Sequence, residues 1–368
     1  MMPFPKIHDL YIGRVVLLYV LAAWFVVVGM DFMIGGVLTE VQSNVGKGAF
    51  TTLDAIVVSL YTVPYRMYFH FPTAAVIGSL LALGQLAATS ELTVMRALGL
   101  SRRRISLAVA MVIGLMTLVM MINVETISPW AQDRAAAYRT ARKTNDTIML
   151  QFKGVWAREG DTFISATEGQ NHDEGHDRWL ELRGMRLYEF ESNGRLKSIA
   201  YVQSGEHRPG GWVLKGVDRV TFSDNSVQKT HADQEQWQST LDDTALASTV
   251  SRPRFMSTHD LKQALDYRER NQLDPGEVEE HYWSHWFYPL NVLALCLAAI
   301  PFAFGTLRSG GLGKRLFLGI VFAIGFMMLQ TQMARLAGAF KLDFRIAYLV
   351  PVAVMLGISW LLFRRRSS

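Results

Sequence analysis

Charged side chains within otherwise apolar segments are the residues of this sequence best suited to binding a ligand in a membrane. Asp31, Arg66 and Arg335 lie in such segments, and Arg134 and Arg139 follow shortly after another one. A charge at the centre of a membrane helix costs roughly 2.5–3.5 kcal/mol on insertion scales, so it rarely faces lipid. Arginine binds phosphate through paired hydrogen bonds and keeps its charge. We therefore predict that these five residues line a chamber for an anionic amphiphile, with phosphates at its mouth and acyl chains below.

A structural interpretation of the same residues stays open. Asp31 would then pair with Arg335 as a bridge between helices, or the arginines would extend to lipid headgroups. Neither arrangement requires a ligand.

Two segments contain residue types that bind metals. His281 and His285 have the helical spacing at which two imidazoles can share a zinc ion, but Tyr282 stands where the zinc-protease pattern needs glutamate. The aromatic residues around them favour an interfacial belt. The segment from His172 to His176 is favoured as a solvated loop. We expect no metal site, and no spacing of Ser, His and Asp indicates catalytic residues.

A nucleotide site is also not expected. The segment Ser309–Arg315 approaches a phosphate-binding loop, but it lacks the first glycine and the hydroxyl residue after the lysine. It also joins two apolar segments, where such a loop joins a strand to a helix. ATP hydrolysis, if it is involved, must be supplied by a partner protein.

A short polar stretch between two long apolar segments offers a place for that partner. A helix is predicted at about residues 89–99, with Ser90 as N-cap and Gly99 as its C-terminal stop. Leucine and methionine recur on one face of it, which favours docking into a hydrophobic groove of another protein. The alternative is a surface loop without contacts. The expected contact residues are Ser90, Glu91, Leu92, Met95, Arg96 and Leu98.

Six apolar segments position these residues, three on each side of a polar insert. Their approximate ranges are 14–38, 53–87, 105–124, 281–304, 316–339 and 346–363. The apolar core of each segment is near the ~20 residues that span a bilayer. We expect a membrane region at 1–124, an insert at 125–280 and a second membrane region at 281–368.

Composition agrees with a membrane protein. Half of the 368 residues are hydrophobic, the net charge is +5, and the mean hydropathy is +0.16. The charge pattern does not indicate nucleic-acid binding. Cys296 is the only cysteine, which excludes an internal disulfide and a cysteine-based metal site.

Lysine and arginine flank the apolar segments mainly on one side, around residues 6–14, 96–104, 308–315 and 364–366. The positive-inside rule then places both termini and the 89–99 helix in the cytoplasm. The insert lies outside, which is the periplasm if the cell is Gram-negative.

The insert has the pattern of an antiparallel sheet. Strands are predicted within 154–167, around a turn at Arg158–Asp161, and within 179–190, 196–205 and 212–222, separated by turn residues. A helix is predicted at 258–272. Such spacing is typical of a sandwich or jelly roll. The expected fold is thus an α+β membrane protein with six transmembrane helices, arranged three and three, and a periplasmic β-jellyroll insert.

Three motifs carry a resemblance to a known family. They are the segment Ser90–Gly99, the pair Phe71-Pro72 with Gly78 and Gly84, and the exit Phe304–Ser309 of the fourth apolar segment. The sequence resembles the LptF/LptG permeases of the lipopolysaccharide export ABC transporter. Trp156–Gly160 and Trp283–Pro289 resemble the LptG branch more than the LptF branch.

The resemblance implies one half of a transporter that extracts lipopolysaccharide from the inner membrane of a Gram-negative bacterium. An LptF-type permease would be its partner, an LptB-type ATPase dimer would bind ATP and Mg²⁺, and LptC would add a membrane helix and a β-jellyroll. No cofactor would bind this chain itself. Glu91 would contact the ATPase, and Arg139 matches a basic position beyond the third helix.

One departure from the family pattern concerns the first helix. Related proteins carry lysines at its outer end, whereas Phe32–Val45 contains no Lys or Arg here. The phosphate contact would then move to Arg66, Lys47 or Arg139. Two alternative functions stay open, namely the LptF paralogue of the same complex and a non-transporting scaffold that recruits periplasmic β-jellyroll partners.

Overall fold

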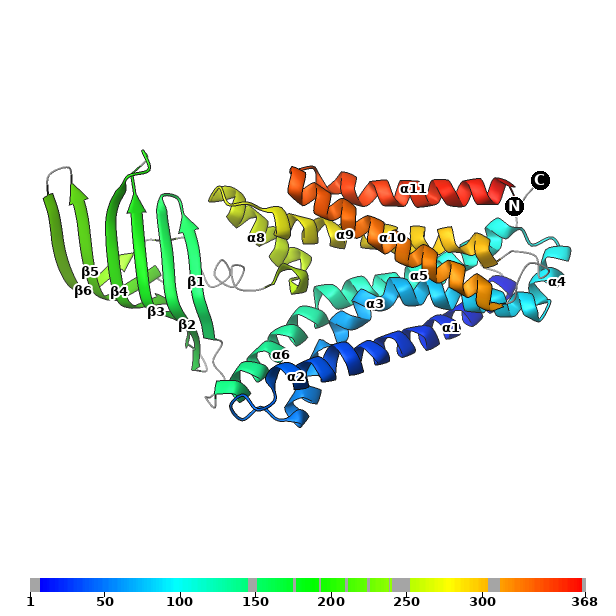
Figure 1. Cartoon of the computed structure of the whole chain (residues 1–368), viewed down its shortest axis with the longest axis horizontal. Coiled ribbons are helices and arrows are strands. Elements are labelled where there is room, and N and C mark those ends of the chain that lie inside the picture. The colour runs from blue at the N-terminus through cyan, green and yellow to red at the C-terminus, as the bar shows by residue number, and fades with distance from the viewer. Residues whose placement is uncertain are drawn as a thin grey trace. The chain divides into compact units, whose positions relative to one another are not determined.

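The computed structural model of the protein describes residues 7–144, 151–174, 177–191, 193–208, 211–223, 226–237, 239, 252–303 and 312–365. Helices precede and follow a run of strands (Figure 1). The helices before the strands are α1 Ile7–Asp31, the π-helix η1 Phe32–Leu38, α2 Thr39–Asn44, α3 Thr52–Ala88, α4 Glu91–Ala97, α5 Arg102–Glu125 and α6 Ile127–Thr144. The strands are β1 Gln151–Glu159, β2 Thr162–Glu174, β3 Asp177–Phe190, β4 Leu196–Arg208, β5 Gly211–Ser223 and β6 Ser226–Trp237. After them come the 3₁₀ turn η2 Pro253–Phe255 and the helices α8 Thr258–Arg270, α9 Gly276–Ala303, α10 Leu312–Phe340 and α11 Phe344–Arg365.

The chain forms two compact units. The first comprises Met1–Ser43, Ala55–Gln132 and Glu279–Ser368, and the second comprises Asn44–Asp54 and Asp133–Val278. The second unit therefore combines the insert with the short connection between the first two long helices. The predicted boundaries at 124/125 and 280/281 do not include that connection in the insert.

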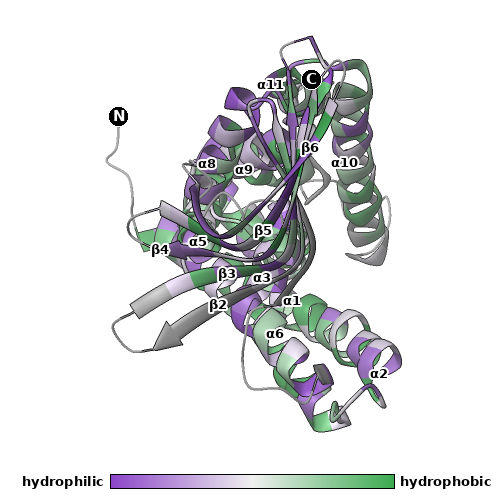
Figure 2. Ribbon diagram, turned by 90° about the vertical axis from the view of Figure 1, so that its left-hand side faces the viewer, coloured by the Kyte–Doolittle hydropathy of each residue, from purple (hydrophilic) through white to green (hydrophobic). Residues whose placement is uncertain are grey.

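Among the residues that the structure describes, five helical stretches are long and apolar enough to cross a membrane. They are Ile7–Asn44, Thr52–Ala88, Arg102–Glu125, Gly276–Ile300 and Ile320–Phe340. A shorter apolar stretch, Phe344–Gly357, belongs to α11. Figure 2 shows the corresponding contrast in hydropathy, for example between α10 and the polar strand β6. These helical stretches confirm the prediction of a helical membrane protein with a β insert, and the count of six membrane spans stays a prediction.

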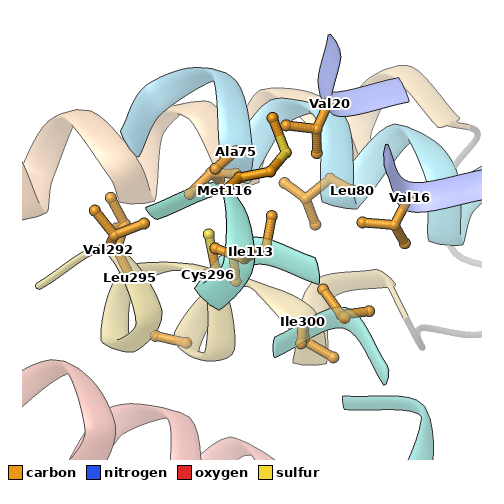
Figure 3. Close-up of a cluster of buried hydrophobic side chains, with 14 of the residues drawn as sticks. Val16, Val20, Ala75, Leu80, Ile113, Met116, Val292, Leu295, Cys296 and Ile300 are labelled. Atoms are coloured by element: carbon orange, nitrogen blue, oxygen red, sulfur yellow. The ribbon is translucent and has the colours of Figure 1, made fainter. Parts of the chain in front are cut away.

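Apolar side chains of α1, α3, α4, α5, α9, α10 and α11 form the core of the first unit, and Figure 3 shows part of it. The labelled residues are Val16 and Val20 of α1, Ala75 and Leu80 of α3, Ile113 and Met116 of α5, and Val292, Leu295, Cys296 and Ile300 of α9. Leu92 of α4 belongs to the same cluster and is 4% exposed. Packing against this core therefore fixes α4 as well as the long helices.

Proline interrupts the hydrogen bonds of α3, and neighbouring side chains compensate. Pro72 has no N–H to donate to the carbonyl four residues earlier, that of Tyr68. The hydroxyl of Tyr288 donates to that carbonyl oxygen at 2.9 Å. The two tyrosine rings also stack, with centroids 4.1 Å apart. The Phe71-Pro72 motif is thus accommodated by a side chain from α9.

The six described strands form one antiparallel sheet in sequential order, β1-β2-β3-β4-β5-β6. The predicted turn at Arg158–Asp161 joins β1 to β2, with Gly160 at a φ of +56°. Buried residues such as Leu182, Val202 and Trp212 form a separate core. On α8, the hydroxyl of Tyr267 donates to the carbonyl of Arg158 at 3.0 Å. The described residues confirm an antiparallel sheet, and the jelly roll stays a prediction.

The helices α1 and α3 come into close contact at Gly78. A Cβ atom at this position would lie 2.6 Å from the backbone nitrogen of Val20 and 2.7 Å from its Cγ2. Such distances require the helices to separate, because the obstacle includes backbone atoms.

We expect Gly78→Ala to lower the thermal unfolding midpoint of the detergent-solubilised protein, because overpacking typically costs about 1–3 kcal/mol. The control is Gly325→Ala, where a Cβ would meet nothing within 4 Å. Alanine favours helix over glycine by about 1 kcal/mol, so the control should be neutral or stabilising. Equal midpoints for both variants would contradict the close contact. Tryptophan fluorescence during heating measures both.

Candidate functional site

The predicted 89–99 helix is present as α4, between the long helices α3 and α5. Its C-terminal end follows the expected pattern, with Gly99 at a φ of +93° and the N–H of Leu100 donating to the carbonyl of Met95 at 3.0 Å. Its start differs from the prediction. Ser90 has a φ of +62°, and its side chain makes no capping hydrogen bond. The left-handed backbone of Ser90 turns the chain directly out of α3.

The apolar side chains of α4 do not all face a partner, which corrects the predicted stripe. Leu92 is buried and Met95 packs against the same core, so both contact this chain's own helices. Val94 and Leu98 are 56% and 82% exposed. The short helix needs tertiary packing to be stable, and Leu92 and Met95 provide it. The surface left for a partner therefore contains Val94, Arg96 and Leu98.

Glu91 is held by two side-chain donors. The hydroxyl of Tyr11, on α1, donates to Glu91 Oε2 at 2.7 Å, and the hydroxyl of Thr89 donates to Oε1 at 3.1 Å. The carboxylate is thus oriented before any partner binds. A sequence pattern cannot reveal the contact with Tyr11, because 80 positions separate the two residues.

A buried ion pair lies close by in the chain, at the first turns of α1 and α5. Arg104 donates from Nη2 to Asp9 Oδ2 at 2.8 Å and from Nε to Asp9 Oδ1 at 3.1 Å. Asp9 is 0% exposed. Such a bidentate pair fixes direction as well as distance. The contacts of Asp9 and Tyr11 tie the start of α1 to α5 and to α4.

Asp31 and Arg66, two of the predicted chamber residues, are brought together. They form an ion pair between α1 and α3, and His70 Nε2 lies 3.2 Å from Asp31 Oδ2. Arg66 also donates to the hydroxyl of Thr62 at 3.0 Å and to the carbonyl of Gly35 at 2.9 Å. The alternative of a bridge from Asp31 to Arg335 is therefore wrong, because the nearer arginine on α3 neutralises the carboxylate.

The other three predicted arginines have different surroundings. Arg335 lies on α10 in the first unit with its side chain exposed. Arg134 and Arg139 lie on α6 in the second unit, where Arg134 is exposed and Arg139 is partly buried. Of the three charged residues predicted within apolar segments, Asp31 and Arg66 pair with each other, and Arg335 has an exposed side chain.

A cluster around Asp54 was not predicted. Its carboxylate is 5% exposed and accepts hydrogen bonds from the N–H of Thr51 at 2.8 Å and the hydroxyl of Tyr138 at 2.7 Å. Arg142 Nε lies 3.2 Å from the same carboxylate. The spacing of Thr51 and Asp54 is that of a capping box, so this contact could have been predicted from the sequence. The contacts with Tyr138 and Arg142 of α6 could not, because these residues lie more than 80 positions away.

The histidine segments do not form a metal site in the part of the chain that the structure describes. His285 is buried against the ring of Tyr68, and its Nδ1 lies 4.0 Å from Glu125 Oε1. His172 falls within β2 and not in the predicted loop, whereas His176 lies outside the described residues. The Phe304–Ser309 motif and the glycines at 310 and 311 also lie outside them.

Comparisons with known proteins agree along nearly the whole chain. The family described as "Lipopolysaccharide export system permease LptF/LptG" matches residues 10–365. "Lipopolysaccharide export system permease protein LptG" of Escherichia coli (strain K12) is 30% identical over 369 residues, which cover 99% of this chain and 100% of the relative. The protein of the same name from Haemophilus influenzae is 27% identical over 361 residues, covering 97% and 98%.

These matches confirm the resemblance to the LptF/LptG permeases that the segment Ser90–Gly99 and the Phe71-Pro72 motif carry. The family consists of permease subunits of an ABC transporter and not of catalytic subunits. The described part of the chain contains five apolar helices of membrane-spanning length, and the chain is a multi-pass inner-membrane protein. It belongs to the LptF/LptG family of lipopolysaccharide export permeases.

Proposed function

We propose that this chain is the LptG-type permease subunit that extracts lipopolysaccharide from the inner membrane and passes it to a periplasmic bridge toward the outer membrane. The match to LptG relatives over their full length carries this proposal. An LptF-type permease is the proposed partner within the membrane, and LptC contributes a membrane helix and a β-jellyroll. The insert is proposed to lie in the periplasm, because basic residues flank the opposite ends of the apolar helices.

The proposed coupling step takes place at α4. An LptB-type ATPase dimer, with its own ATP and Mg²⁺, docks on the exposed face of α4 that contains Arg96 and Leu98, next to the carboxylate of Glu91. Since Leu92 and Met95 are packed into the core, α4 cannot move without the helices behind it. The Tyr11 hydroxyl then transmits the movement of Glu91 to α1. This path supports conversion of ATPase closure into movement of the membrane helices.

The proposed substrate contacts differ from the first expectation. Asp31 and Arg66 neutralise each other, so neither offers a free charge to phosphate. Arg335 is exposed at membrane depth and is proposed to bind a lipopolysaccharide phosphate, with Arg134 and Arg139 as further basic contacts. Exposed apolar side chains such as Leu18 and Phe25 of α1 suit acyl chains. Arginine binds phosphate better than lysine because its planar guanidinium donates hydrogen bonds to two phosphate oxygens at once.

We expect Glu91→Arg to abolish co-purification of the ATPase dimer with the permease, because the substitution reverses the charge at the proposed docking surface. It also removes the acceptor of the Tyr11 hydrogen bond. Affinity purification through a tag on the ATPase, followed by quantification of this chain, measures the loss.

The matched control for this variant is Glu269→Arg on α8, an exposed acid at which the same charge reversal is made. It should leave co-purification unchanged. Retention of the full ATPase complement by Glu91→Arg would refute α4 as the docking element.

We expect Arg335→Glu to reduce ATP-driven release of lipopolysaccharide from proteoliposomes several-fold while ATPase co-purification persists. The substitution places a negative charge where a phosphate is proposed to bind. The conservative change Arg335→Lys should retain part of the activity, because lysine keeps the charge and loses the paired geometry. Unchanged release by Arg335→Glu would exclude a contact with the phosphate.

A further inference from the structure

The first apolar helix contains a π-helical segment. η1 covers Phe32–Leu38 and continues directly from α1, with Asp31 and Thr39 both in right-handed helical conformation on its flanks. The helix is therefore widened rather than broken. A π segment interrupts the ordinary ladder of i to i−4 hydrogen bonds and is common at functional sites. In hydrocarbon, a carbonyl without a donor costs several kcal/mol, so the segment needs a compensating group.

Arg66 supplies the compensating donors from α3. Its Nη1 donates to the carbonyl of Asp31 at 3.2 Å, and its Nη2 donates to the carbonyl of Gly35 at 2.9 Å. Its Nε donates to the hydroxyl of Thr62, and Nη1 also pairs with the carboxylate of Asp31. Four of the five N–H donors of a guanidinium are thus in use. A side chain so occupied is suited to holding backbone, not to binding a passing phosphate.

Small residues make this contact possible. A Cβ atom at Gly35 would lie 3.0 Å from Arg66 Nη1 and would also meet the carboxylate of Asp31. At Gly36, which is buried, a Cβ would meet the side chain of Ser59 at 3.4 Å. The two glycines allow α3 to approach the widened turn. The adjacent glycines, the ion pair of Asp31 with Arg66 and the two carbonyl contacts together form one binding site for the guanidinium of Arg66 on η1.

We propose that Arg66 is a positioning residue that holds the first membrane helix in its π-helical form, and that η1 is a joint whose change to α-helix accompanies transport. This rests on the proposed function. A π turn contains about one residue more than an α turn, so the change rotates the following helix by about 100°. The exposed face after η1 then changes while α1 stays fixed at Asp9 and Tyr11. Arg66 selects between the two forms because only the π form presents both carbonyls to it.

Spin labels test the joint directly. In the full complex with Cys296→Ser, labels at Leu38 and Leu60, both exposed, report the rotation of η1 against α3 by pulsed electron paramagnetic resonance. Arg66→Ala should shift the distance distribution, and Arg66→Lys should not restore it. Lysine can neutralise Asp31 but cannot reach two carbonyls and Thr62 together. Arg345→Ala, which removes an exposed arginine on α11, should leave the distribution unchanged. An unshifted distribution in Arg66→Ala overturns the proposal.

Deletion of Gly36 provides a second test that does not depend on Arg66→Ala being well folded. Removing one residue permits a continuous α-helix, so the deletion should restore the yield of the complex in the Arg66→Ala background. The double variant should hydrolyse ATP and bind its partners but lose lipopolysaccharide release, because the joint is locked. Normal release by the double variant overturns the role in transport. No recovery of yield overturns the role of Arg66 in holding η1.

Failure of this inference can be told from failure of the proposed function. If Glu91→Arg and Arg335→Glu both leave transport intact, the proposed function fails, whatever the labels report. If those variants behave as expected and the distance distribution is unshifted in Arg66→Ala, only the proposed role of Arg66 and η1 is rejected.

Discussion

Hydrocarbon provides no hydrogen bonds, and this constraint explains the polar contacts among the long helices. At η1, where the helix is widened, and at Pro72, which removes a donor, a side chain from another helix donates to the backbone. Arg66 serves the carbonyls of Asp31 and Gly35, and Tyr288 serves that of Tyr68 next to Pro72. A further side-chain contact to backbone joins α5 to α3, because Asn123 donates to the carbonyl of Pro64 at 2.8 Å. At η1 and at Pro72, irregular backbone is therefore paired with a polar side chain, and each pair joins two helices at a defined place.

These pairs divide the first helix into a fixed end and an adaptable end. Its first turn is held by the buried ion pair of Asp9 with Arg104 and by the hydrogen bond of Tyr11 to Glu91. Its later part is widened at η1, where Arg66 donates to the carbonyls of Asp31 and Gly35. In the proposed change of η1 from π-helix to α-helix, the start of the helix stays fixed and the part after η1 rotates. This arrangement suits a permease subunit that receives its energy from a separate protein.

Patterns that depend on composition and short spacing were predictable from the sequence. The ranges of α3 and α5 follow from long apolar runs, and the β1–β2 turn follows from Gly160. The helix α6 and the strand β6 were missed, because both are polar overall and neither contains a long apolar run. The π form of η1 was missed too, since the run Phe32–Leu38 is equally compatible with an α-helix. The partners of Asp31 and Glu91 could not be inferred, because contacts across 35 and 80 positions leave no periodic signal.

The cluster around Asp54 has a consequence for how the chain is made. The carboxylate lies at the start of the second long helix, yet its donor Tyr138 is synthesised 84 residues later. In the same unit, the N–H of Ala49 donates to the carbonyl of Arg142 at 2.9 Å. The last turn of α6 is thus hydrogen-bonded to the backbone of the segment between α2 and α3. In a nascent chain that stops short of α6, the carboxylate of Asp54 therefore lacks its two partners on α6, Tyr138 and Arg142. Biogenesis of the first helical hairpin is completed only after the third long helix has been synthesised, which orders insertion and folding in time.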